Sequence, residues 1–268
     1  MTERLAGGKL LLDFPAEAVA RIRISNPERR NALDHEILDT LAETLPRLDR
    51  GIETRCVLIT GAPPAFSAGY DLTSIPSQTF ERDAEALVAH PFHDAMEALA
   101  AHPWPTVAAI NGACLGGGLE LAITCDVRLC ASGAKLGMPP AKLGLVYGHT
   151  GLRKFLDVLG LARTKELFLT GRNFDAERAE RIGLVHEVIG TDSFDEAAVE
   201  LAAGIAANAP LSTRGNKRAI EVLNANPVLS EQQEGALIAL RESCFASEDL
   251  REGVAAFAEK RKPRWQGR

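Results

Sequence analysis

A carboxylate follows three consecutive glycines near the middle of the chain, where Gly116-Gly117-Gly118 precedes Glu120 at the start of a predicted helix over Leu119 to Thr124. Glycine lets the backbone approach a ligand closely, and the free N–H groups at a helix start favour developing negative charge. The neighbours of Glu120 are apolar, so burial would raise its pKa and make it a usable acid or base near neutrality. Two interpretations of Glu120 are open: a first-turn residue that helps the helix to start, or a catalytic acid or base.

The elements on either side of this helix would hold it in place. The apolar, partly β-branched run from Thr106 to Ile110 predicts a buried strand, and Asn111-Gly112 is typical of the turn that ends one. A further strand is predicted over Asp126 to Ala131. The glycine turn and Glu120 would therefore lie between two strands of a sheet.

Hydrophobic periodicity predicts alternating strands and helices in the rest of the chain. The N-terminal part reads as a hairpin followed by a helix that Asp34 caps. From Asp195 onward the pattern is almost wholly helical. The predicted elements are strands at Lys9 to Phe14, Val19 to Ser25, Arg55 to Thr60, Lys135 to Gly137 and Val185 to Ile189, and helices at Asp34 to Arg50, Gly151 to Leu159, Thr164 to Leu169 and Phe174 to Ile182.

Length and composition exclude several function classes. The chain has 268 residues, of which 46% are hydrophobic, and this is enough for a large core. Its 30 Lys and Arg against 36 Asp and Glu give a net charge of −6, which argues against a nucleic-acid partner. No segment reaches the roughly 18 uncharged residues of a membrane helix. We expect a cytoplasmic protein with a small-molecule substrate and no membrane or nucleic-acid partner.

The cysteines and histidines predict neither disulfides nor a metal site. The five cysteines are odd in number, lie in apolar contexts and form no CxxC pair. We therefore expect reduced, buried thiols. His90 and His93 could share a helical face as metal ligands, but Pro91 lies between them and no carboxylate–histidine motif follows.

Five segments of the chain, taken in order, resemble the enoyl-CoA hydratase/isomerase, or crotonase, superfamily. They read PERRNAL at 27–33, AFSAGYDL at 65–72, INGACLGGGLELAITCD at 110–126, LFLTGRNFDAERAERIGLVHEV at 167–188 and EGVAAFAEKRKP at 252–263. The resemblance implies an α/β fold, with a spiral of β-β-α repeats that binds acyl-CoA over residues 1–194 and a helical oligomerisation region over 195–268. It also implies an acyl-CoA thioester as substrate, with coenzyme A as part of that substrate and no separate cofactor.

The same resemblance implies roles for individual residues. The N–H groups of Tyr70 and Gly117 match the family's two oxyanion donors, and Glu120 matches its catalytic carboxylate. Arg29 matches a basic residue that meets the coenzyme A phosphates, although an arginine in such a loop can equally be a solvated charge. The implied coenzyme A contacts are Arg29, Phe66, Ser67, Ala68, Tyr70, Asp71, Leu72 and Gly116, together with Phe257 and Lys260 from a neighbouring subunit.

The chain departs from the family's hydratases at one informative position. Those enzymes carry a second glutamate where this chain has Pro140, and simple isomerases of the family often rely on that glutamate too. The segment from Met138 to Tyr147 resembles bacterial methylmalonyl-CoA decarboxylases, in which a tyrosine stands at the position of Tyr147. Val146 and Tyr70 depart from that subgroup, which has proline and histidine there.

Three functions are open at this point. The first is a methylmalonyl-CoA decarboxylase-like lyase in which Glu120 and Tyr147 are catalytic and an oxyanion-stabilised enolate forms. The second is an enoyl-CoA hydratase or isomerase that uses Glu120, with a further group such as His149. The third is a non-catalytic relative that binds acyl-CoA or RNA; the net charge argues against RNA and the retained glutamate against a dead enzyme.

The C-terminal helical region should pack against other subunits. Its apolar residues would form exposed stripes if it stood alone. In the resembling family such an arm builds trimers and hexamers, so we expect a homotrimer or homohexamer. The apolar residues concerned are Leu237, Ile238, Leu240, Phe245, Val254 and Phe257.

Overall fold

A seven-stranded sheet forms the centre of the molecule. The computed structural model describes residues 2–71, 83, 86, 88–226 and 228–268. The strand order is β1-β2-β3-β4-β6-β8-β11, with antiparallel pairing from β1 to β3 and parallel pairing beyond. The bounds are β1 Glu3–Leu5, β2 Leu10–Ala16, β3 Val19–Ile24, β4 Cys56–Gly61, β6 Thr106–Ile110, β8 Val127–Ala131 and β11 Glu187–Ile189.

A second sheet has the order β10-β9-β7-β5 and consists of short strands. Their bounds are β5 Ala65–Ser67, β7 Ala113–Leu115, β9 Lys135–Gly137 and β10 Phe174–Asp175. Each of β4, β6 and β8 in the first sheet is followed along the chain by β5, β7 or β9 in the second, and a helix comes next. This repetition is the predicted β-β-α spiral. The short strands β5 and β7 were expected to be loop or turn, because three residues are too few for a periodic signal.

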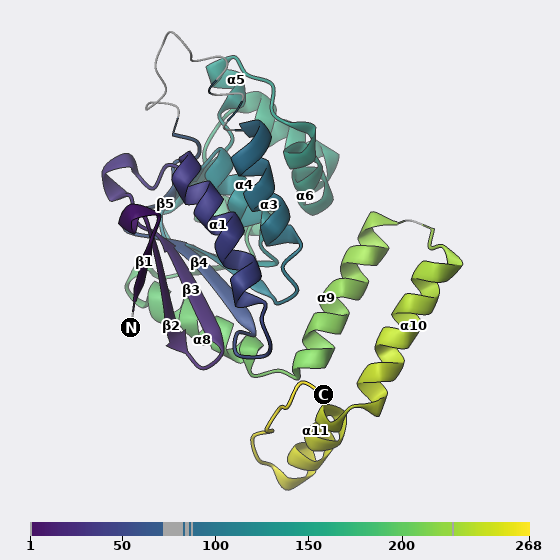
Figure 1. The fold of residues 1–268 in the computed structure, drawn as a ribbon. Helices are drawn as coiled ribbons and strands as arrows, with labels where there is room; N and C mark the ends of the chain where they lie inside the picture. The colour runs from purple at the N-terminus through teal and green to yellow at the C-terminus, as the bar shows by residue number, and fades with distance from the viewer. Residues whose placement is uncertain (1, 72–82, 84–85, 87, 227) are drawn as a thin grey trace.

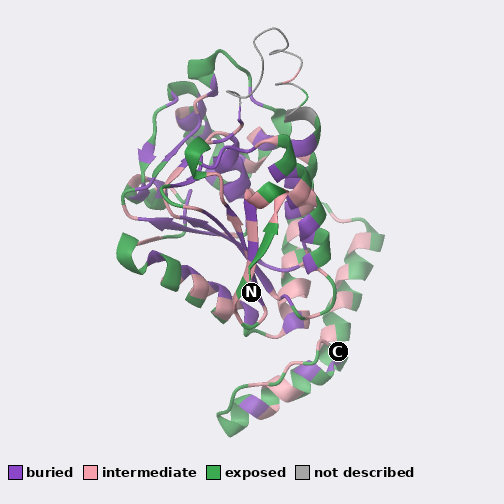
Figure 2. Ribbon diagram, turned by 60° about the vertical axis from the view of Figure 1, so that its left-hand side comes forward, coloured by how far each residue is buried: buried purple, intermediate pink, exposed green. Residues whose placement is uncertain are grey.

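Helices cover both faces of the long sheet. On one face, α1 (His35–Leu48), α3 (His93–Ala100) and α4 (Gly117–Thr124) enclose the larger hydrophobic core with the second sheet. On the other face, α8 (Phe194–Ala206) buries Phe194, Ala198, Ala202 and Ala206 against β4, β6 and β8. β4 and β6 are buried along their whole length, as expected for parallel strands covered on both sides. Figure 2 shows this burial concentrated on the sheets and the inner helices.

Local sequence signals account for several helix boundaries. The Asp34 side chain accepts a hydrogen bond of 2.9 Å from the N–H of Ile37 and so caps α1 as predicted. The long helix α6 (His149–Thr170) is interrupted at Gly160, whose φ is 68°, and this agrees with the two helices expected there. The remaining core helices are α5 (Pro140–Leu143) and α7 (Ala176–Arg181).

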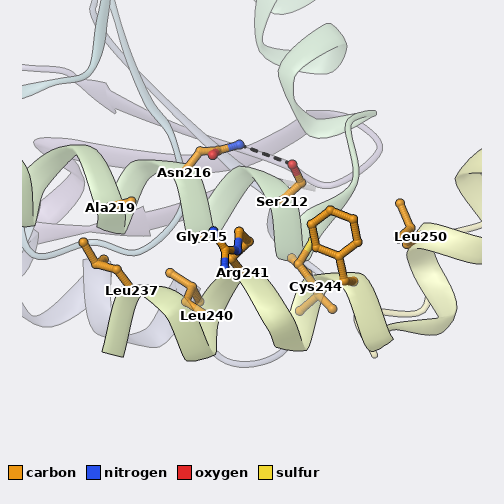
Figure 3. A pocket seen from close by; sticks show the side chains of 11 residues that line it. Ser212, Gly215, Asn216, Ala219, Leu237, Leu240, Arg241, Cys244 and Leu250 are labelled. Carbon is orange, nitrogen blue, oxygen red and sulfur yellow. Dashed lines mark hydrogen bonds between the residues drawn. The ribbon is translucent and has the colours of Figure 1, made fainter. Parts of the chain in front are cut away.

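Three C-terminal helices form an arm that extends away from the core (Figure 1). They are α9 (Pro210–Ala225), α10 (Glu231–Ala246) and α11 (Glu248–Glu259). Between α9 and α10 lies an apolar cavity of about 230 Å³, in which Leu237 and Leu240 face Gly215 and Ala219 (Figure 3). By its packing α8 goes with the core, so the projecting part begins at Pro210. The predicted division of the chain at residue 194 stays a prediction.

The described helices give no sign of a membrane span, because none of them is both long and apolar enough to cross a bilayer. Within the same residues, no group of three or more His, Cys, Asp or Glu side chains lies close enough to hold a metal ion. Four of the five cysteines are buried, and all five are unpaired thiols.

Candidate active site

The first turn of α4 meets the segment around Tyr70, which brings the two predicted oxyanion donors together. Gly69 has a φ of 93°, and a Cβ on it would lie 2.8 Å from the Leu115 carbonyl oxygen and 3.1 Å from the Gly117 nitrogen. A Cβ on Gly117 would lie 2.6 Å from the Tyr70 ring. Only glycine fits at both positions, since these distances are shorter than real Cβ contacts. Gly69 and Gly117 therefore allow the two backbone segments to approach each other closely.

The N–H groups of Tyr70 and Gly117 are left without partners in the hydrogen-bond network of the described residues. Tyr70 is held by a parallel bridge to Leu33, in which the Leu33 N–H donates to the Gly69 carbonyl and the Asp71 N–H donates to the Leu33 carbonyl. That bridge uses the groups on either side of Tyr70 and leaves its own N–H unused. Gly117 is the first residue of α4, where an N–H has no partner within the helix.

The carboxylate of Glu120 is buried beside these donors, with only 4% of the residue exposed. The Tyr147 hydroxyl donates a hydrogen bond of 2.6 Å to Glu120 Oε2. Because its proton is used in that bond, Tyr147 accepts from the Tyr70 hydroxyl, which lies 3.2 Å away. The three side chains form a directed chain from Tyr70 through Tyr147 to Glu120.

Burial is the main influence on the pKa values of Glu120, Tyr147 and Tyr70. Burial raises the pKa of Glu120 above its ordinary value, while the hydrogen bond from Tyr147 and the charge of Lys154 act in the opposite direction. Burial also raises the pKa of Tyr147 and of Tyr70 well above that of a free phenol. Both phenols therefore stay protonated near neutrality and can act as donors, and Glu120 is the carboxylic acid among the three groups.

The start of α6 lies directly over Glu120, and sequence reasoning did not anticipate this. A Cβ on Gly151 would come within 2.5 Å of Glu120 Oε2 and 2.8 Å of the Tyr147 ring. Lys154, one turn further on, places its Nζ 4.0 Å from Glu120 Oε1. Neither residue carries a local sequence signal for the site, because the approach of α6 to α4 is set by tertiary packing.

Pro140 and His149 give Glu120 no second acid or base in the described contacts. Pro140 is the buried first residue of α5, where its ring suits the helix start. His149 is exposed at the start of α6, and no hydrogen bond joins it to Glu120. The suggestion that His149 supplies the second catalytic group therefore has no support from its position.

The predicted coenzyme A loop packs against the PERRNAL segment. Phe66 and Ser67 are buried in β5, the Ala68 N–H donates to the Arg30 carbonyl, and the Gly69 N–H donates to the Ser67 hydroxyl. Several backbone groups of this loop are thus paired within the chain. Leu72 lies outside the described residues.

Arg29 and Asp71 form an ion pair at the edge of this loop, with 3.9 Å between Arg29 Nη1 and Asp71 Oδ1. Asp71 is buried, whereas the Arg29 side chain is half exposed. Gly116, with a φ of 53°, turns the chain into α4 beside the same region. These placements fit the predicted coenzyme A contacts without testing them.

Phe257 and Lys260 lie at the far end of the arm from α4 (Figure 1). Phe257 is 88% exposed, and Lys260 ends α11 in a left-handed conformation with a φ of 54°. Within one chain they do not reach the site. Their suggested contact with a neighbour's adenine pocket stays a prediction.

Comparisons with known proteins agree with this arrangement. The enoyl-CoA hydratase/isomerase family model matches residues 15–268. A probable enoyl-CoA hydratase of Mycobacterium tuberculosis is 37% identical over 254 residues, which are 94% of this chain and 96% of the relative. A short-chain-enoyl-CoA hydratase of Clostridium acetobutylicum is 32% identical over 249 residues, covering 91% and 92% of the two chains.

Solved structures match equally well. The crystal structure of an enoyl-CoA hydratase from Bacillus anthracis superposes with a TM-score of 0.88 at 32% identity, over 97% of this chain and 100% of the other. These three relatives are named as enoyl-CoA hydratases and not as methylmalonyl-CoA decarboxylases. With its two-sheet fold and these matches, the chain belongs to the enoyl-CoA hydratase/isomerase, or crotonase, family of enzymes that act on acyl-CoA.

Proposed function

We propose that this enzyme is an enoyl-CoA hydratase, which adds water reversibly across the 2,3 double bond of an enoyl-CoA thioester. The observation that carries the proposal is the buried Glu120 carboxylate beside the unpaired N–H groups of Tyr70 and Gly117. Relatives over nearly the whole chain carry the hydratase name, which supports the same reaction.

The proposed reaction uses the two N–H groups as a binding site for the thioester oxygen. Glu120 takes a proton from a water molecule, and the water oxygen bonds to carbon 3 of the substrate. The double-bond electrons move toward the thioester carbonyl and give an enolate, whose negative oxygen accepts hydrogen bonds from Tyr70 and Gly117. Glu120 then returns the proton to carbon 2. Removing one such donor typically costs about 2.7–4 kcal/mol of transition-state stabilisation.

A single carboxylate can perform both proton transfers, because it ends the first step protonated and starts the second as an acid. In this enzyme Tyr147 holds Oε2, which leaves Oε1 for the water. The hydrogen bond from Tyr147 also favours the ionised form of Glu120, and so prepares it as a base. The glutamate that is replaced by Pro140 is therefore not required by this scheme.

Decarboxylation of a malonyl-type thioester has less support. Such a substrate brings its own carboxylate, which needs an uncommitted donor and a site free of negative charge. The Tyr147 hydroxyl already donates to Glu120 at 2.6 Å, so its proton is not available without breaking that bond. An ionised Glu120 would also repel the substrate carboxylate. Decarboxylation stays a prediction that the same assay examines.

The test compares crotonyl-CoA, a 3-enoyl-CoA and methylmalonyl-CoA as substrates of the wild-type enzyme and of Glu120→Gln. We expect hydration of crotonyl-CoA by the wild type and a loss of roughly 10²–10⁴-fold in kcat/KM for the variant, because the amide cannot exchange the proton. Glu43→Gln, on the exposed side of α1, is the matched control and should leave the rate unchanged. Release of CO₂ from methylmalonyl-CoA without hydration of crotonyl-CoA would overturn the proposal, and conversion of the 3-enoyl-CoA alone would make the enzyme an isomerase.

A further inference from the structure

Lys154 is a partly buried cation beside Glu120, and the scheme above gives it no role. Its side chain is 26% exposed, and its Nζ lies 4.0 Å from Glu120 Oε1, the oxygen that Tyr147 does not bind. The Tyr147 hydroxyl binds Oε2 of the carboxylate, and the ammonium of Lys154 faces Oε1.

A hydroxyl on α4 fixes the ammonium in that place. Lys154 Nζ donates a hydrogen bond of 2.8 Å to Thr124 Oγ1. The Thr124 hydroxyl in turn donates at 2.8 Å to the backbone carbonyl of Glu120, one turn earlier in the same helix. These two hydrogen bonds therefore tie the lysine from α6 to the helix that carries Glu120.

We propose that Lys154 is a positioning residue that keeps Glu120 ionised and oriented as the base of the resting enzyme. The proposal rests on the proposed function, because it needs Glu120 to act as a base. Lys154 is not assigned contact with the substrate.

The charges around the pair support this role. Glu120 is faced by the neutral phenols of Tyr147 and Tyr70, by His93 from α3 and by Lys154 from α6. His93 acts in the same direction as Lys154 only when it is protonated, and it lies 3.2 Å from Glu97. Among these groups Lys154 is the amine, so it supplies the positive charge near neutrality. Burial lowers the pKa of Lys154 below its ordinary value, and the facing groups Glu120, Cys125 and Glu97 act in the opposite direction.

The direction of the effect follows from electrostatics. A buried carboxylate is costly when ionised, and a nearby cation lowers that cost. Without the cation, the hydrogen bond from Tyr147 would be the main influence that lowers the pKa of Glu120 against the effect of burial. The pKa of Glu120 would therefore rise further. The base form would then be populated only at higher pH.

The experiment measures kcat/KM for crotonyl-CoA across pH in Lys154→Met, which keeps the length of the side chain and removes its charge. We expect the acid limb of the profile to move upward by about one pH unit, with about a tenfold lower rate on the acid side and recovery at high pH. KM should change little. Lys154→Arg should restore the wild-type limb, and Thr124→Val should move it in the same direction as Lys154→Met but less.

Lys165→Met is the matched control, because Lys165 is exposed on the same helix, and it should leave the profile unchanged. If Lys154→Met does not fold, Lys154→Gln gives the same test while still able to donate to Thr124. The proposal is overturned if Lys154→Met keeps the acid limb of the wild type, or if its kcat/KM falls by the same factor at every pH. An active Glu120→Gln enzyme would instead remove the proposed function itself, so the two failures are distinguishable.

Discussion

At the scale of single residues, the chemistry depends on how Glu120 can be buried and still ionise. Its surroundings are apolar apart from one phenol on Oε2 and one ammonium near Oε1. Burial raises its pKa, and both partners lower it, so the base form should be lost as pH falls through a value above that of an ordinary glutamate. The rate of hydration should fall as the ionised form of Glu120 is lost. A partly exposed carboxylate would not couple these effects so directly, because water would screen them.

Arg29 carries the prediction for coenzyme A binding. The guanidinium lies beside Asp71 with half of its surface exposed, so it can reach a phosphate without leaving the loop. Arg29→Gln should weaken binding of free coenzyme A by about tenfold, since a charged hydrogen bond to phosphate contributes about 1.5 kcal/mol or more. Calorimetric titration measures this, with Arg30→Gln as the neighbouring control. Equal affinity in the wild type and Arg29→Gln would show that Arg29 is only a solvated loop charge.

At the scale of elements, the site depends on the approach of α6 to α4. The two helices meet where Gly151 faces Glu120, and the missing side chain makes room for the carboxylate and the Tyr147 ring. The same helix then supplies Lys154 one turn later. Glycine ordinarily weakens a helix. At position 151, however, any larger residue would place a side-chain atom against the Glu120 carboxylate.

Gly151→Ala tests this packing. The new Cβ would meet Glu120 Oε2 at 2.5 Å, so the carboxylate must move and the rate of crotonyl-CoA hydration should fall roughly 10²-fold. Gly204→Ala in α8 is the matched control, because nothing lies within 4 Å of the added atom. It should leave the rate unchanged and raise the free energy of unfolding by up to about 1 kcal/mol. Chemical denaturation and steady-state assays read both effects, and a fully active Gly151→Ala enzyme would contradict the packing argument.

At the scale of the whole molecule, the C-terminal arm is the part whose apolar surface a single chain does not cover. Its helices α9, α10 and α11 project from the core (Figure 1). Large apolar side chains on these helices are exposed. Such stripes on a projecting element usually mark a protein interface. The exposed apolar residues of the arm include Ile220, Leu223, Ile238, Phe245, Val254 and Phe257.

The corresponding prediction is a homotrimer or a homohexamer. Phe245 and Val254 are 70% and 64% exposed, so replacing both with glutamate removes apolar surface from the outside of the arm without opening the core. The double variant should sediment as a smaller species, while its core keeps a cooperative unfolding transition. Analytical ultracentrifugation at micromolar concentration decides this. A wild-type protein that sediments as a monodisperse monomer would contradict the prediction.

Local signals in the sequence determined the elements that carry the site. The hairpin of β2 and β3, the Asp34 cap of α1, the glycine start of α4 and the helical C-terminal region follow from periodicity, turn residues and capping, which act over a few neighbouring residues. The family resemblance added the prediction that the N–H groups of Tyr70 and Gly117 are oxyanion donors. It also singled out Tyr147, but as a catalytic residue of a decarboxylase that would act on a substrate carboxylate.

Only the tertiary structure decided what these residues do to one another. Tyr147 donates to a glutamate 27 positions earlier, and Lys154 and Gly151 reach the same carboxylate from a different helix. Such contacts depend on how α6 crosses α4 and on the register of two sheets. These are set by packing over the whole core, and no short segment encodes them. The short strands β5 and β7 belong to the same class, because they exist only through pairing with distant strands.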